Sequence, residues 1–179
     1  MDDLSRRDLI KLGAAATLTA TLSVGETLAQ PAAAATVPAF FTQDEFALLD
    51  ELSDLIIPTD RHSPGAKAAK VAAYIDFRLS EAFDENDKAV WRDGLKLVEQ
   101  VARAMHGKTF VQSSEAERVA VLTRMAQKED QPQNPEEVFF AVLKGAVVRG
   151  YYTSEIGIKQ EMEYKGNSYL AEFVGFDVS

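Results

Sequence analysis

The side chains that most often perform catalysis or bind metal ions are scarce in this sequence. It contains no cysteine and two histidines, His62 and His106. Without thiols the chain cannot form disulfides, Cys-ligated zinc sites, iron–sulfur clusters or covalently attached haem. Neither histidine has a partner at HxxE, HxxxH or HExxH spacing. A metal site would need both histidines together with Asp60 or Asp76, and the alternative is that both are ordinary polar residues, one in a loop and one at a helix end.

Glycine-rich phosphate-binding motifs are also missing. The ten glycines never occur as G-x-G, which excludes the GxGxxG fingerprint of a dinucleotide site, and GxSxG is absent as well. Residues 145–151 have the glycine spacing of a P-loop, but Tyr151 stands where a lysine would contact phosphate. We therefore expect no cofactor, flavin included, to be held by this chain alone.

Carboxylates are the one abundant class of chemically active side chain. The 28 acidic residues include no pair that stands out for glycoside hydrolysis, although the sequence alone leaves such a pair open. The acidic residues 84–87 lack the spacing of an EF-hand, so we expect a solvated turn with Asp87 capping the next helix. The sequence thus predicts no catalytic, cofactor-binding or metal-ligating residue.

Length and composition indicate one globular domain with a leader. The chain has 179 residues, of which 46% are apolar and 26% charged, and this balance is typical of a folded protein. Its formal net charge is −9. An acidic chain of this kind does not neutralise phosphates, so nucleic acid is not an expected partner.

The first 35 residues have the order of features found in an export signal. Arg6 and Arg7 lie in the run Ser-Arg-Arg-Asp-Leu-Ile-Lys, which is followed by the uncharged residues 12–25. Residues 29–35 are rich in small side chains, as the cleavage region of a signal peptide is. We interpret residues 1–35 as a twin-arginine signal and linker, and residues 36–179 as the folded domain. The alternative is an accidental arginine pair before an apolar helix.

The remaining chain predicts an all-α fold of about five helices and an irregular tail. Thr42 and Ser114 each begin a capping box, and Pro135 occupies the first position of a helix. The expected helices span residues 43–57, 66–82, 87–106, 115–127 and 135–150. The residues expected to point inward are Leu49, Leu52, Leu55, Ile56, Val71, Tyr74, Ile75, Leu79, Trp91, Leu95, Val98, Ala102, Met105, Val119, Leu122, Met125, Phe139, Val142, Leu143, Ala146 and Val147.

Two segments are not explained by helix periodicity, and they resemble the gluconate 2-dehydrogenase subunit 3 family. Residues 54–60 read Asp-Leu-Ile-Ile-Pro-Thr-Asp, and residues 151–157 read Tyr-Tyr-Thr-Ser-Glu-Ile-Gly. The flanking residues, and the leader with its paired arginines, also look like that family. The resemblance extends from residue 6 to residue 167.

The resemblance implies the small subunit of a bacterial flavin dehydrogenase, periplasmic or located at the inner membrane through its complex. The catalytic subunit of such a complex is an FAD-containing flavoprotein of the glucose–methanol–choline type, often joined by a c-type cytochrome. The complex would oxidise a sugar, sugar acid or polyol. Because flavin and haem motifs are absent from this chain, the resemblance does not imply that the chain itself performs the oxidation.

Independent reasoning from the leader leads to a similar function. Twin-arginine export moves folded proteins, usually because a cofactor is inserted before export. A small chain without a cofactor site is most simply interpreted as an escort for a folded partner. Two alternatives stay open, namely a stand-alone periplasmic helical binding module and a periplasmic enzyme that acts through carboxylates.

The aromatic tail after residue 150 is the expected contact with that partner. Aromatic rings between glycines either cap the domain's own core or line a contact with another chain, and both readings are open. We predict an interface with the flavoprotein formed by Tyr151, Tyr152, Thr153, Ser154, Gly157, Tyr164 and Gly166.

Overall fold

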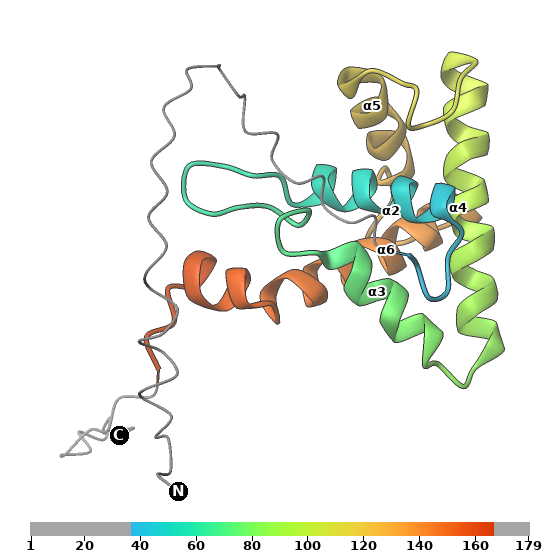
Figure 1. Ribbon diagram of the computed structural model, residues 1–179. Coiled ribbons are helices and arrows are strands. Elements are labelled where there is room, and N and C mark those ends of the chain that lie inside the picture. Colours follow the sequence, from blue (N-terminus) through green and yellow to red (C-terminus); the bar gives the residue numbers. More distant parts are fainter. Residues whose placement is uncertain (1–36, 167–179) are drawn as a thin grey trace, which may run out of the picture. The chain divides into compact units, whose positions relative to one another are not determined.

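The computed structural model describes residues 37–166, which are helical and contain no strand (Figure 1). The chain divides into the units Met1–Thr36 and Val37–Ser179, and all described residues belong to the second. Arg6, Arg7 and the rest of the leader therefore lie outside the described residues, as does the end of the tail. The elements are α2 (Gln43–Ile56), α3 (Val71–Ser80), α4 (Glu85–His106), α5 (Glu115–Met125), α6 (Pro135–Tyr152) and the short π-helix η1 (Gly157–Glu161). The all-α prediction is confirmed.

Both predicted capping boxes are present. The Glu45 backbone N–H donates to Thr42 Oγ1 (3.2 Å), and the Thr42 N–H donates to the Glu45 carboxylate (2.9 Å). Ser114 and Glu117 make the same reciprocal pair at the start of α5. Each box satisfies two backbone N–H groups that a helix terminus leaves without an intrahelical acceptor, so these starts are encoded locally.

Three predicted helix boundaries are wrong. The second helix starts at Val71 and not at residue 66, because Lys70 has a φ of 56°, a left-handed conformation that interrupts the helix. α4 starts at Glu85, since Asp84 accepts the Asn86 N–H (2.8 Å) and is the N-cap that we assigned to Asp87. α6 continues past Gly150 to Tyr152, and the tail expected to be irregular contains η1.

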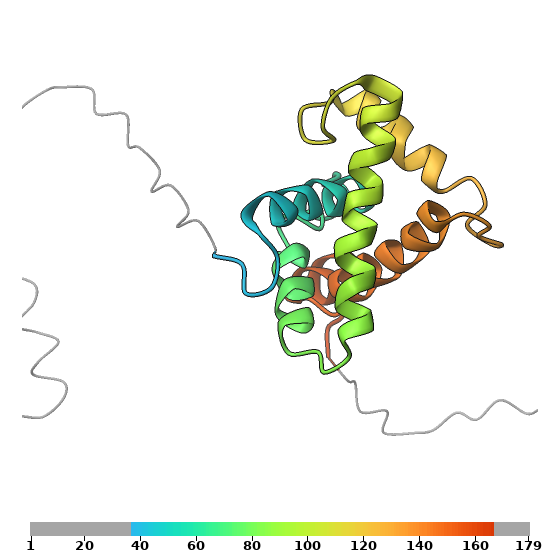
Figure 2. The ribbon, with the colours of Figure 1, turned by 90° about the vertical axis from the view of Figure 1, so that its right-hand side faces the viewer.

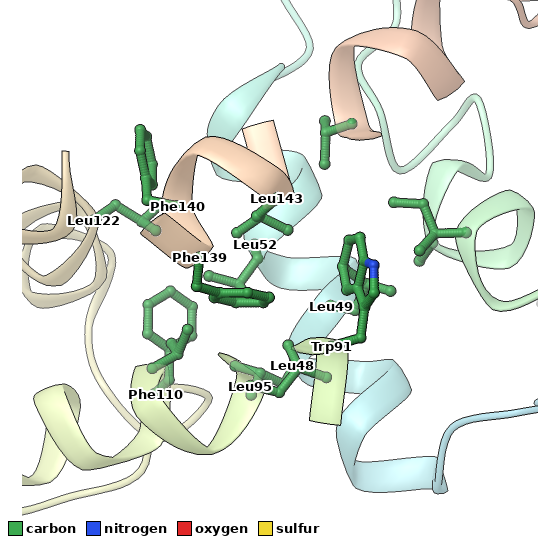
Figure 3. Packing of buried hydrophobic residues seen from close by; sticks show 14 of the residues in the cluster. Leu48, Leu49, Leu52, Trp91, Leu95, Phe110, Leu122, Phe139, Phe140 and Leu143 are labelled. Carbon is green, nitrogen blue, oxygen red and sulfur yellow. The ribbon is translucent and has the colours of Figure 1, made fainter. Parts of the chain in front are cut away.

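α4 is the longest of these helices and packs against α2, α5 and α6 (Figure 2). Its Trp91 ring meets the Phe139 ring of α6 edge-to-face, with centroids 5.7 Å apart. Figure 3 shows that side chains from α2, α4 and α6 point toward one another around these rings. At the crossing of α4 and α6, Gly94 lies against the Phe139 ring, where a Cβ would overlap it. The glycine therefore sets how closely the two helices approach.

Four of the residues expected to point inward are exposed. They are Tyr74, Met105, Val119 and Val142. Each lies at helical spacing from buried residues but on the flank or the outer side of its helix. Apolar periodicity alone does not separate these positions from the core when a helix has apolar residues on more than one side.

The start of the folded domain is held by one buried carboxylate. Asp76 of α3 accepts backbone N–H groups from Ala39 (2.6 Å), Phe40 (3.0 Å) and Phe41 (2.9 Å). The Phe41 ring is buried beside Trp91. Asp76 therefore joins the segment before α2 to α3 through charge-assisted hydrogen bonds.

Candidate partner-binding site

Residues 151–157, one of the two segments that helix periodicity did not explain, meet the loop that directly follows the other segment, residues 54–60. The Tyr151 hydroxyl lies 2.7 Å from Ser63 Oγ and donates to the Pro64 carbonyl (2.8 Å). Tyr151 is 1% exposed, so these bonds satisfy a hydroxyl that has no access to water. We call residues 57–66 together with residues 151–161 the loop–tail junction.

The loop side of the junction is ordered by short-range hydrogen bonds. Asp60 Oδ1 accepts the N–H groups of His62 (2.7 Å) and Ser63 (2.9 Å). The backbone N–H groups of Ser63 and His62 lower the pKa of the Asp60 carboxyl below its usual range. The Gly65 N–H donates to Thr59 Oγ1 (2.9 Å), and a Cβ at Gly65 would lie 2.5 Å from the Ile57 carbonyl oxygen. The loop thus folds tightly back on the end of α2.

The tail side of the junction turns sharply after α6. Ser154 Oγ donates to the Tyr151 carbonyl (2.6 Å) and accepts the Gly157 N–H (3.0 Å). A Cβ at Gly157 would overlap the Tyr151 carbonyl, so the backbone of η1 can approach α6 only at a residue without a side chain. Isolated π-helical turns are frequent at functional sites.

His62 connects the two sides a second time. Its Nε2 lies 3.1 Å from the Glu161 carbonyl oxygen, 99 residues away in the sequence. The pKa of His62 is raised, first by this backbone hydrogen bond and then by the carboxylates of Glu161, Glu163 and Asp60. His62 is therefore a structural link between loop and tail.

The seven predicted interface residues fall into three groups by burial. Tyr151 and Gly157 are buried, so they belong to this domain's own packing. For Tyr151 this corrects the prediction, because a ring and hydroxyl enclosed by Ser63 and Pro64 cannot touch another chain. Ser154 is half-buried, and the exposed members are Tyr152, Thr153, Tyr164 and Gly166. For these the interface role stays a prediction.

Sequence reasoning missed two features of the site. It did not single out Ser63, whose distance from Tyr151 along the chain hides their contact. It also placed Val142 inward, whereas Val142 lies on the outside of α6 together with Val138. The signal for the second feature was present, because α6 has only four charged residues among its 18, namely Glu136, Glu137, Lys144 and Arg149. A helix this apolar is normally covered on more than one side.

The described residues do not assemble a metal site. No group of three or more His, Cys, Asp or Glu side chains comes close enough within residues 37–166 to hold an ion. Asp60 and Asp76 are occupied by backbone N–H groups, and His106 Nδ1 lies 4.0 Å from Glu117 Oε1. The proposed set of both histidines with Asp60 or Asp76 is therefore not brought together.

Residues of α2, α4 and the segment 109–112 line a groove of about 680 Å³. Its carboxylates include Glu45, which caps α2, and Glu99, which accepts the Phe110 N–H (3.1 Å). Both already serve the backbone, so the groove does not single out an acid–base pair for catalysis. None of the helices described for residues 37–166 has the length and apolar character needed to cross a membrane.

The fold and the loop–tail junction define the class: a small all-α domain in which residues 57–66 and 151–161 are joined through the buried Tyr151 hydroxyl. The family model described as gluconate 2-dehydrogenase subunit 3 matches residues 43–169, and the chain belongs to this family. The match includes both sides of the junction. The family name is that of an accessory-type subunit in a multi-subunit dehydrogenase. No curated protein and no solved structure matches the chain.

Proposed function

We propose that this chain is the non-catalytic small subunit of a periplasmic FAD-dependent dehydrogenase. It would bind and stabilise the flavoprotein that oxidises a sugar, sugar acid or polyol, and escort it through twin-arginine export. The observation that carries the proposal is the family match over residues 43–169, which includes both sides of the loop–tail junction. A c-type cytochrome is a further expected member of the complex.

The chemistry of the chain supports a role without catalysis. The sequence has no cysteine and no GxGxxG or haem motif, so a flavin or haem would have to be held by another subunit. Two carboxylates of the groove, those of Glu45 and Glu99, accept backbone N–H groups at a helix start and in a loop. A carboxylate-based enzyme has no observation in its favour among the described residues.

The position of the arginine pair ahead of the helical domain supports the escort role. Arg6 and Arg7 precede Ala39, whose N–H donates to Asp76 in the earliest side-chain hydrogen bond along residues 37–166. We therefore infer that signal and folded domain are separate in sequence, and we expect a change in the arginine pair to leave the fold of the domain intact. A folded flavoprotein bound to this domain would be exported with it.

The test replaces both arginines by lysine in the full chain, in cells that produce the whole complex. Lysine keeps the charge but not the planar guanidinium, so recognition by the export machinery should be lost. We expect active dehydrogenase to remain inside the cell and dye-linked activity to disappear from the periplasmic fraction. Lys11→Arg is the control, because it alters a nearby basic residue and leaves the pair intact.

Three results would change the proposal. Normal periplasmic activity in the double variant would remove the escort role and leave a structural subunit. Bound flavin or dye reduction in the purified chain alone would contradict the non-catalytic role. A monomer that never co-purifies with a flavoprotein would favour a stand-alone binding module.

A further inference from the structure

One face of α6 is apolar, exposed and uncovered by the described residues. Val138, Val142, Gly145, Arg149 and Tyr152 follow the spacing i, i+4, i+7, i+11 and i+14, which places them on one side of the helix. We call these five residues the outer face of α6. Val138 is 49% exposed, Val142 37% and Tyr152 39%, and Gly145 and Arg149 are also exposed.

The opposite side of α6 is apolar as well and already forms the core. It buries Phe139, Leu143 and Val147. A helix on the surface of a globular protein normally turns a polar side to water, and a helix that is apolar all round is normally covered all round. The outer face of α6 thus has the composition of a surface that another element covers.

The other charged residues of α6 serve this domain. Lys144 binds Glu129 (2.6 Å), and Glu136 lies 3.9 Å from Arg124. Glu137 caps the helix by accepting the Gln133 N–H (2.7 Å). Arg149 is consequently the one charge on the outer face, and its guanidinium has no ion pair within residues 37–166.

Gly145 lies at the centre of the outer face, and this domain gives no packing reason for a glycine there. A Cβ at this position would meet nothing within 4 Å, in contrast to Gly94 on α4. Glycine inside a helix destabilises it by about 1 kcal/mol relative to alanine. What glycine provides in return is room for another backbone to approach closely.

We propose that the outer face of α6 is the docking surface for the catalytic flavoprotein subunit. This inference rests on the proposed function and names the surface and the chemistry that it requires. The partner presents an apolar segment whose backbone passes over Gly145, and it supplies a carboxylate to Arg149. Tyr152 adds an anchor, because its ring packs edge-to-face on the buried Tyr151 ring at 5.3 Å and is therefore held in place.

Charge complementarity decides against a second copy of this chain as the occupant. Two outer faces packed on each other would contain two arginines and no carboxylate, because no member of the face is acidic. Burying a guanidinium without a partner is strongly unfavourable. The face therefore fits a different protein that provides the missing acid.

The first experiment compares two exposed valines in the full chain, produced with an affinity tag in cells that contain the complex. Val142→Glu adds a charge to the outer face, whereas Val119→Glu adds the same charge to an exposed position on α5. Co-purified FAD and dye-linked dehydrogenase activity are the readouts. We expect Val142→Glu to reduce both at least about tenfold, with helical circular dichroism unchanged, and Val119→Glu to retain both.

The second experiment addresses the charge and the identity of the partner. Arg149→Glu should abolish co-purification, and Arg149→Lys should keep part of it, because the charge survives without the guanidinium geometry. A photo-crosslinking residue at position 138, an exposed member of the outer face that leaves Gly145 unchanged, should join the chain to the flavoprotein, identified by mass spectrometry. A crosslink to a second copy of this chain would overturn the proposal.

The outcomes separate this inference from the proposed function. If the unchanged chain brings down no flavoprotein, the proposed function fails and the inference falls with it. If the unchanged chain and Val142→Glu bring down the flavoprotein equally well, the function stands and the docking surface is wrong.

Discussion

The hydroxyl of Tyr151 lies 2.7 Å from Ser63 Oγ, across 88 residues of sequence. Through this contact the end of α6 holds the loop that follows α2, and the same hydroxyl also donates to the Pro64 carbonyl. Phenylalanine at this position would lack both hydrogen bonds. The contact also assigns the ring to the core, while Tyr152 beside it faces outward.

Replacing Tyr151 by phenylalanine should destabilise the domain by about 1–2 kcal/mol without unfolding it. The ring still fills its place, but the half-buried Pro64 carbonyl loses its shorter hydrogen bond and keeps only the longer one from Ser63 Oγ (3.4 Å), while Ser63 loses a partner. Denaturant-induced unfolding measures the change. Tyr152→Phe is the matched control and should change the free energy of unfolding by less than about 0.5 kcal/mol. Equal stability of both variants would show that the junction is not held by this hydroxyl.

Replacing Asp76 by alanine should reduce the free energy of unfolding by about 3 kcal/mol. Three backbone N–H groups, those of Ala39, Phe40 and Phe41, lose their acceptor in a largely buried place. Amide hydrogen exchange at these three residues should become much faster. Asp93→Ala, which removes an exposed partner of Lys96, should cost less than about 1 kcal/mol. Unchanged exchange at residues 39–41 would contradict the anchoring role of Asp76.

The two glycines Gly94 and Gly145 should respond to alanine with opposite signs. At Gly94 the new methyl group would overlap the Phe139 ring and force α4 and α6 apart, at a cost of about 1–3 kcal/mol. At Gly145 it meets open space, so alanine should stabilise the isolated chain by up to about 1 kcal/mol. Thermal and denaturant unfolding of both variants provide the comparison. A loss of stability in Gly145→Ala would reveal a contact of this residue inside the domain.

Acid should weaken the start of α5 through Glu117. The Lys108 ammonium and the Ser114 N–H stabilise its charged form and lower its pKa from 4.5 to about 2. Because the folded pKa is the lower one, the stabilisation is complete above the unfolded value and is lost as the pH falls from about 4.5 to about 2.

Glu117→Gln should remove this part of the pH dependence, measured as the unfolding free energy across that range. Glu115→Gln removes the same charge from the same helical turn without touching the contact to Lys108, and should leave the slope in place. An unaltered slope in Glu117→Gln would show that other carboxylates cause the acid sensitivity.

The sequence by itself determined the features that depend on neighbours within one helical turn. The capping boxes at Thr42 and Ser114 join residues three positions apart, so the starts of α2 and α5 are readable without a fold. The two family-like segments were also readable, as residue types that no helical period demands. The all-α class followed from the helical spacing of the apolar residues.

Only the tertiary structure decided what depends on distant contacts. The helix at Val71 begins late because the turn before it packs back on the end of α2, where the Ala66 N–H donates to the Ile57 carbonyl (2.8 Å). The inward direction of Tyr151 depends on Ser63, and the outward direction of Val142 depends on which side of α6 meets α4. A helix that is apolar on both sides has no periodic signal to choose between them, so the choice falls to the packing of the other helices.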